Sequence, residues 1–241
     1  MIRISIITAL FCLFMLFLPS CQEKYTFTVS AASNLTFALK EIGALFTEKT
    51  GVKVVFNFAS TGQLAHQIEQ GAPVDLFLSA NTSYIEELDR HGLIEPDSKR
   101  IYARGKLTLW MRKDSPVKVR KIEELLQPRI GRIAIANPDH APYGIAAREA
   151  LEKVGLWDKL KYKLVMAVNV RQALQYAETG NVDVAIIPLS LSSKAVGYWV
   201  EVPEKILPPL NQMLAIPESA RHRRESLLFI DFLLSPQGST I

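Results

Sequence analysis

Cysteine is nearly absent from this chain, since its 241 residues contain only two, Cys12 and Cys21. Cys12 falls within an apolar N-terminal run, so a processed chain would keep Cys21 alone. This excludes an internal disulfide, a thiolate metal site and a Cys-x-x-Cys redox pair. Histidine is also scarce, with four residues and no HxxxH or HExxH spacing. We therefore expect no metal held directly by protein ligands.

The signatures of several enzyme and nucleic-acid-binding classes are missing as well. The sequence has no Walker motif, no G-x-G-x-x-G and no G-x-S-x-G. The net charge is +4 and is spread along the chain. The densest basic cluster, 221–224, is typical of a solvated helix face and not of a nucleic-acid footprint. We expect no cofactor, no nucleic-acid partner and no enzymatic activity.

The N-terminus has the features of an export signal. Arg3 precedes an uncharged, mostly apolar run, Ile4–Leu18, which is shorter than the ~20 residues of a transmembrane helix. The run ends in Leu18-Pro19-Ser20-Cys21, which resembles the lipobox of bacterial lipoproteins. We predict a signal peptide at 1–20 and lipidation of Cys21, with the protein anchored to a membrane in the periplasm or at the cell surface. The alternative is an ordinary signal peptide and a soluble periplasmic protein.

From Tyr25 onward, predicted strands alternate with predicted helices. The expected strands are Tyr25–Ser30, Val52–Phe58, Val74–Leu78, Lys106–Met111, Ile133–Ala136, Lys163–Val168, Asp183–Ile187, Tyr198–Val202 and Gln212–Ile216. The expected helices are Leu35–Thr47, Gln63–Gln70, 81–91, Lys121–Leu126, Tyr143–Val154, Val170–Glu178 and Ala220–Leu234. This alternation predicts an α/β fold with mostly parallel sheets flanked by helices.

The stretch Asn137–Leu151 combines a rigid loop with the start of a helix. It follows the apolar strand Ile133–Ala136, and Pro138 and Pro142 are expected to hold the loop extended. The helix that follows would begin with unpaired N–H groups at Tyr143-Gly144. Because such groups favour negative charge, this junction is a candidate anion site.

Three other strand-to-helix junctions carry suitable donors. They are Ser33-Asn34, Ser60-Thr61-Gly62 and Val170-Arg171. Each one alone fits ordinary helix capping. However, open α/β sheets bind ligands beyond the carboxyl ends of their strands, where such junctions lie. We therefore expect the four junctions to converge on one ligand.

These junctions belong to blocks that resemble the molybdate-binding proteins of bacterial ABC importers, which are type II periplasmic binding proteins. The resemblance extends from about Tyr25 to the C-terminus. The blocks that carry it are Val29–Leu35, Phe58–Gly62, Gly71–Ala80, Gly105–Leu107, Asn137–Gly144 and Val170–Leu174.

The resemblance implies two α/β lobes that close on a tetrahedral oxyanion, molybdate or tungstate. The side chains of Ser33, Asn34 and Thr61 would bind it, together with backbone N–H groups of Tyr143 and Val170. The protein would be a monomer that delivers the anion to the permease and ATPase subunits of an importer. All these donors are neutral, so selection over sulfate would rest on cavity size.

The sequence departs from the family at one position of the site, and several residues near the site are expected to have structural roles. Many family members have a ligand-binding tyrosine where this chain has Pro188, whereas a branch without it uses an asparagine, which Asn34 matches. We interpret Arg171 as half of an ion pair at the rim and Asp75 as structural. His140 is expected to order its own loop through a hydrogen bond.

The resemblance also predicts the domain organisation. Lobe 1 would comprise 25–103 and 207–241, and lobe 2 would comprise 104–206, so that two crossings form a hinge. Family members usually continue for a further helical turn, so the C-terminus is expected to be short.

Three alternatives remain open at this point. The ligand could be sulfate, thiosulfate or phosphate, although a protonated phosphate needs an acceptor and the four junctions contain no carboxylate. The protein could be a secreted hydrolase that uses Ser33, which would need a histidine beside that serine. It could also be a lipid-anchored sensor without a transporter.

Overall fold

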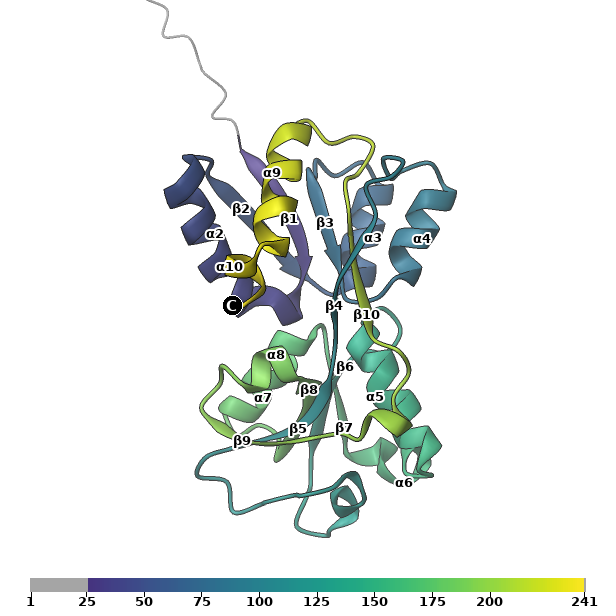
Figure 1. Ribbon diagram of the computed structural model, residues 1–241. Helices are drawn as coiled ribbons and strands as arrows, with labels where there is room; N and C mark the ends of the chain where they lie inside the picture. Colours follow the sequence, from purple (N-terminus) through teal and green to yellow (C-terminus); the bar gives the residue numbers. More distant parts are fainter. Residues whose placement is uncertain (1–25, 241) are drawn as a thin grey trace, which may run out of the picture.

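The computed structural model describes residues 26–240, and the predicted signal peptide and Cys21 lie outside this range. The chain forms two bodies, each built from one sheet with helices packed on it (Figure 1). Within residues 26–240 the structure has no helix that is both long and apolar enough to span a membrane. The expected α/β class is confirmed.

The first sheet has the strand order β2-β1-β3-β10-β4. Its strands are β1 (Phe27–Ala32), β2 (Val54–Ala59), β3 (Leu76–Ser79), β4 (Arg100–Arg104) and β10 (Asn211–Ala215). The helices of this body are α2 (Thr36–Thr50), α3 (Thr61–Glu69), α4 (Ser83–Arg90), α9 (Arg223–Leu234) and α10 (Pro236–Ser239). β1 pairs in parallel with β2 and β3, whereas β10 is antiparallel to both β3 and β4. Only β10 therefore runs against the other strands.

The second sheet has the order β7-β6-β8-β5-β9. Its strands are β5 (Leu107–Arg112), β6 (Ile133–Ala136), β7 (Leu164–Ala167), β8 (Val184–Pro188) and β9 (Gly197–Glu201). Its helices are α5 (Pro142–Lys153), α6 (Trp157–Leu160), α7 (Val170–Glu178) and α8 (Leu189–Ser192), with 3-10 turns at Ile122–Leu126, Lys161–Lys163 and Glu204–Ile206. β6 is parallel to β7 and β8, and β5 is antiparallel to β8 and β9.

The two sheets share one topology, with β1 and β2 of the first corresponding to β6 and β7 of the second. In each pair both strands are followed by a helical segment, so each body presents two helix starts at the carboxyl ends of parallel strands. The chain crosses from the first sheet to the second between Arg104 and Leu107, and it returns between Glu201 and Asn211. In Figure 1 the paired strands β4 and β10 lie at the centre, pointing from one body to the other.

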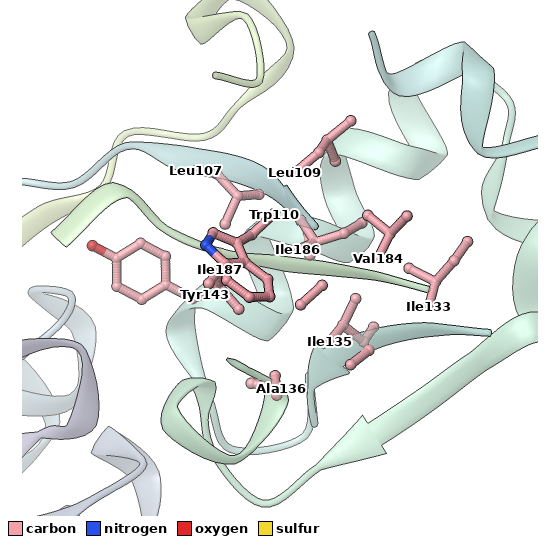
Figure 2. Packing of buried hydrophobic residues seen from close by; sticks show 14 of the residues in the cluster. Leu107, Leu109, Trp110, Ile133, Ile135, Ala136, Tyr143, Val184, Ile186 and Ile187 are labelled. Atoms are coloured by element: carbon pink, nitrogen blue, oxygen red, sulfur yellow. The ribbon is translucent and has the colours of Figure 1, made fainter. Parts of the chain in front are cut away.

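Each of the two bodies is stabilised by its own hydrophobic core. In the first, Phe27, Phe46 and Phe229 are buried and in contact, with the Phe46 and Phe229 ring centroids 5.0 Å apart. In the second, Trp110 lies among buried aliphatic side chains of β5, β6 and β8 (Figure 2). These side chains come from apolar strands that are buried on both faces, as a parallel sheet covered by helices requires.

Several predicted element boundaries were wrong, and each error has a local cause. β4 was missed because its residues are mostly exposed and carry Arg100 and Arg104 at its ends. α5 begins at Pro142, one residue earlier than predicted, because proline lacks only an N–H that the first helical turn leaves unpaired. The short helices α6 and α8 were missed because four residues carry too little periodicity.

Candidate functional site

All five residues predicted from the sequence line one cavity between the two bodies. The cavity is small, with a volume of about 10 Å³. The lining residues are Ala32, Ser33, Asn34, Ala59, Ser60, Thr61, Ala80, Ala141, Pro142, Tyr143 and Val170. Both sheets contribute, through the segments that follow β1, β2, β6 and β7. The structure therefore brings the four junctions together.

The start of α3 supplies two donors from Thr61. Ser60 caps the helix through a capping box with Gln63. The Ala80 N–H donates to Thr61 Oγ1 over 3.1 Å, so the Thr61 hydroxyl proton remains available for another acceptor. Within the described residues the Thr61 N–H donates no hydrogen bond. Because α3 begins at Thr61 and not at Gln63 as predicted, the dipole of its N-terminus also favours an anion here.

The start of α5 supplies one donor, not the predicted two. The Gly144 N–H donates to the Ala141 carbonyl over 2.8 Å, so it is not available. The Tyr143 N–H has no acceptor within residues 26–240. The buried Tyr143 side chain packs at one end of the second core with its hydroxyl pointing away from it (Figure 2).

The start of α7 likewise supplies one backbone N–H donor. Asn169 is the N-cap, and its Oδ1 accepts from the Gln172 N–H over 3.0 Å. The Val170 N–H lies inside that cap and donates no hydrogen bond in the part of the chain that the structure describes. Tyr143 and Val170 were predicted to bind a ligand through their backbone N–H groups, and this stays a prediction.

Ser33 and Asn34 form a 3-10 turn ahead of α2, with Leu35 as the third residue. They do not cap α2, because Leu35 is its N-cap and no side-chain cap is present. Both side chains are buried, with 3% of Ser33 and 1% of Asn34 exposed. Two polar side chains buried without a capping role are costly unless a ligand or a neighbour satisfies them.

Among residues 26–240 no charged side chain lines the cavity. Arg171 pairs with Glu178 over 3.0 Å and stacks on Phe37, so its predicted role as an ion-pair partner is confirmed. Asp75 is structural as predicted, since its carboxylate accepts from the backbone N–H groups of Thr28, Arg221 and His222. Burial raises the pKa of the Tyr143 phenol, so this group is also neutral.

Direct hydrogen bonds connect the two bodies around the cavity. The His140 Nδ1 atom lies 2.7 Å from Ser60 Oγ, and the Gly62 N–H donates to the His140 carbonyl over 2.9 Å. On the other side, the Ser190 hydroxyl donates to the Asn34 carbonyl over 2.9 Å. His140 was expected to order its own loop through a hydrogen bond, but the hydrogen bond of its ring goes instead to Ser60, the N-cap of α3.

Ser190 and Gln212 are two polar residues near the site that sequence reasoning missed. Ser190 lies in α8, and Gln212 lies in β10 with its side-chain amide 2.9 Å from that of Asn34. Gln212 lies within a strand, whereas Ser190 lies in the first turn of α8 directly after β8, a junction that was not predicted because α8 was missed. Pro188, expected at the site by position, ends β8 and does not line the cavity.

The hydrolase alternative finds no support in the geometry. Among the described residues no histidine contacts Ser33. The serine that does contact a histidine, Ser60, holds Gln63 within its helix cap. In residues 26–240 no group of three or more His, Cys, Asp or Glu side chains is gathered to bind a metal ion.

Comparison with known proteins places this geometry in context. A profile of the family described as bacterial extracellular solute-binding protein matches residues 27–241. A molybdate-binding protein of Rhodobacter capsulatus is 36% identical over 236 residues, covering 97% of this chain and 92% of the relative. A Bacillus subtilis (strain 168) protein described as an ABC transporter substrate-binding lipoprotein is 32% identical over 223 residues, covering 91% and 85%.

A solved structure gives the same result. The periplasmic molybdate-binding protein of Azotobacter vinelandii superimposes with a TM-score of 0.83 at 30% identity. The match covers 88% of this chain and 94% of that chain.

Proposed function

The chain belongs to the family of bacterial extracellular solute-binding proteins, and from this premise we propose that it captures molybdate, and also tungstate, in the cavity between its two bodies. The expected two-lobed type II fold is confirmed by the superposition on the Azotobacter vinelandii protein. The relatives are binding proteins of ABC importers and not enzymes. This chain is accordingly an extracytoplasmic binding protein whose partners are a permease and its ATPase.

The observation that carries the ligand assignment is the donor set of the cavity. The hydroxyls of Ser33 and Thr61 and the N–H groups of Thr61, Tyr143 and Val170 belong to residues that line one cavity, and none of the described lining residues is charged. A tetrahedral dianion accepts several hydrogen bonds, each contributing about 1.5–3 kcal/mol. Three helix N-termini add a favourable dipole. Donors that are neutral leave no uncompensated charge when the ligand departs.

Selectivity for molybdate and tungstate follows from the rigidity of the donors. The available N–H groups belong to helix ends packed on their sheets, and Thr61 Oγ1 is fixed by the Ala80 N–H. A cavity that cannot contract holds a larger oxyanion with good hydrogen-bond distances but leaves sulfate loosely bound.

The lobes proposed here are 25–103 with 207–241, and 104–206. We place the hinge in the two crossing segments, so that the contacts of His140 and Ser190 form as the lobes close. We also propose that lipidated Cys21 anchors a monomer to the membrane. The lipobox-like sequence 18–21 and the Bacillus subtilis relative, described as a lipoprotein, support this anchor.

Titration calorimetry with molybdate, tungstate, sulfate and phosphate tests the proposal. We expect tight 1:1 binding of molybdate and tungstate, and binding of sulfate and phosphate that is weaker by at least about a hundredfold, or ~2.7 kcal/mol. Equal affinity for sulfate would refute selection by size and favour a general oxyanion carrier.

A further inference from the structure

The side-chain amide of Asn34 has one atom hydrogen-bonded to Gln212 and one atom without a partner among the described residues, and the question is which of the two is the nitrogen. Its Nδ2 faces Gln212 Oε1 over 2.9 Å, and its buried Oδ1 has no partner within residues 26–240. An acceptor left unpaired in a buried site costs about 1–3 kcal/mol. Here the unpaired atom would also face the cavity, because Asn34 lines it and Gln212 does not. A lone pair directed at an anion is repulsive.

The two tyrosines beside Gln212 are also poorly satisfied when Gln212 Oε1 faces Asn34. The Tyr102 hydroxyl lies 3.1 Å from Gln212 Oε1 and 3.2 Å from the Ser79 carbonyl, yet it has one proton for two acceptors. Gln212 Nε2 lies 3.4 Å from Tyr143 Oη, which leaves the Tyr143 proton without an acceptor. Burial raises the pKa of both phenols, so both protons are retained.

Exchanging the nitrogen and oxygen positions in the side-chain amides of both Asn34 and Gln212 removes all these hydrogen-bonding conflicts without changing any distance. The nitrogen and oxygen of an amide have nearly the same shape, so the hydrogen-bond network decides which faces which partner. With Gln212 reversed, its Nε2 donates to Asn34 Oδ1 and to Tyr102 Oη, and Tyr102 donates to the Ser79 carbonyl. The Tyr143 hydroxyl then donates to Gln212 Oε1. The one group left for a ligand is the Asn34 NH₂.

We infer that Gln212 is a positioning residue that fixes the orientation of Asn34, so that Nδ2 and not Oδ1 faces the bound anion. This inference rests on the proposed function. It adds a basis for discrimination that does not depend on size, because the site presents donors and no acceptor at Asn34. A fully ionised oxyanion fits such a site, whereas hydrogen phosphate brings a proton that finds no acceptor.

The test is a double-mutant cycle on molybdate affinity in the purified protein, measured by calorimetry. Gln212→Met removes all three hydrogen bonds of the Gln212 side chain at similar volume and is expected to weaken molybdate binding about tenfold. In an Asn34→Ala background the same change is expected to have less than about a twofold effect. Because a freed Asn34 can turn its oxygen inward, phosphate binding is expected to stay unchanged or improve.

Thr108→Val is the matched control. Thr108 is fully buried in the second body and hydrogen-bonded to the Ile187 carbonyl, so its loss mimics general destabilisation away from the site. We expect a lower Tm and an unchanged molybdate affinity for this variant. Equal losses from Gln212→Met in both backgrounds, or equal weakening of molybdate and phosphate, would overturn the role of Gln212.

A second variant serves if Gln212→Met does not fold. Gln212→Glu keeps the shape, and as a carboxylate it can only accept, which forces Asn34 Nδ2 toward it. Molybdate affinity should then be low near about pH 8 and recover as the pH falls and the buried carboxyl takes up a proton. A pH-independent affinity of this variant would contradict the inference. Failure of the unmodified protein to bind any oxyanion would instead reject the proposed function, and this inference with it.

Discussion

Thr61 is the residue on which the site depends most directly, because it offers both a hydroxyl and a backbone N–H to the cavity. It is fully buried, and its Oγ1 is held by the Ala80 N–H. Its place in the site could be predicted from the Ser-Thr-Gly junction. Which of its atoms remain available could not, since that depends on Ala80, which is contributed by another strand end.

Removing that hydroxyl should weaken ligand binding. Thr61→Ala is expected to reduce molybdate affinity by about 1–3 kcal/mol, the scale of a lost hydrogen bond to a charged group. Thr61→Ser keeps the hydroxyl and is the control, for which we expect a loss under about 1 kcal/mol. Calorimetric titration of both variants decides the point, and unchanged affinity in Thr61→Ala would remove its hydroxyl from the site.

The buried phenols of Tyr102 and Tyr143 make the free energy of unfolding depend on pH in the alkaline range. Burial raises the pKa of each above its unfolded value near 10. The folded chain therefore keeps protons that the unfolded chain loses. Stability from this source is complete below about pH 10 and declines as the pH rises above it.

Urea unfolding between about pH 9 and pH 11 measures this decline. Tyr143→Phe lacks one of the two groups, so its free energy of unfolding should fall less steeply with pH than that of the unmodified protein. Identical slopes for the two proteins would contradict the assignment of a raised pKa to Tyr143.

Among the elements, α5 shows how closely a helix start must approach its strand to build the site. A Cβ on Gly144 would lie 2.2 Å from the Ala136 carbonyl oxygen at the end of β6. That oxygen is backbone and cannot move aside. The sequence predicted the strand, the rigid loop and the helix, but it did not predict this contact or the loss of the Gly144 N–H to Ala141.

Gly144→Ala should therefore destabilise the protein by about 1–3 kcal/mol through overpacking, and displace the Tyr143 N–H. Gly131→Ala is a suitable control, since a Cβ there would meet only Asp183 Oδ2 at an ordinary 3.6 Å. Chemical unfolding and molybdate titration of both variants provide the comparison. If Gly144→Ala were as stable as its control and bound molybdate normally, the close packing would have no functional consequence.

At the scale of the whole molecule, the sequence predicted the four junctions but not what connects the two bodies. The junctions could be predicted because each is a local pattern of a strand followed by donors and a helix. The closing contacts could not, because they join residues far apart in the chain. Ser60 and His140 are separated by 80 positions, and Asn34 and Ser190 by 156. Gln212 lies within a strand, where no local pattern marks it as a neighbour of the site, and Ser190 lies in a four-residue helix that the sequence pattern did not reveal.

The contact of His140 with Ser60 is expected to favour the closed form. His140→Ala removes a side-chain hydrogen bond between the bodies, and His140 is not itself one of the residues that line the cavity. Molybdate affinity should fall by about 0.5–1.5 kcal/mol, and the unliganded protein should have a larger radius of gyration by X-ray scattering. His66→Ala, at an exposed position on α3, is the control. Loss of affinity in both variants alike would argue against a closing role for His140.

The central claim is that neutral donors from both bodies hold one oxyanion, and a crystal structure with bound molybdate tests it most directly. Anomalous scattering from molybdenum locates the ion without assumptions about the protein. The account predicts a single peak in the cavity, with oxygens within hydrogen-bond distance of the Thr61, Tyr143 and Val170 nitrogens and of the Ser33 hydroxyl. A peak elsewhere, or an oxyanion held by a lysine or arginine side chain, would contradict it.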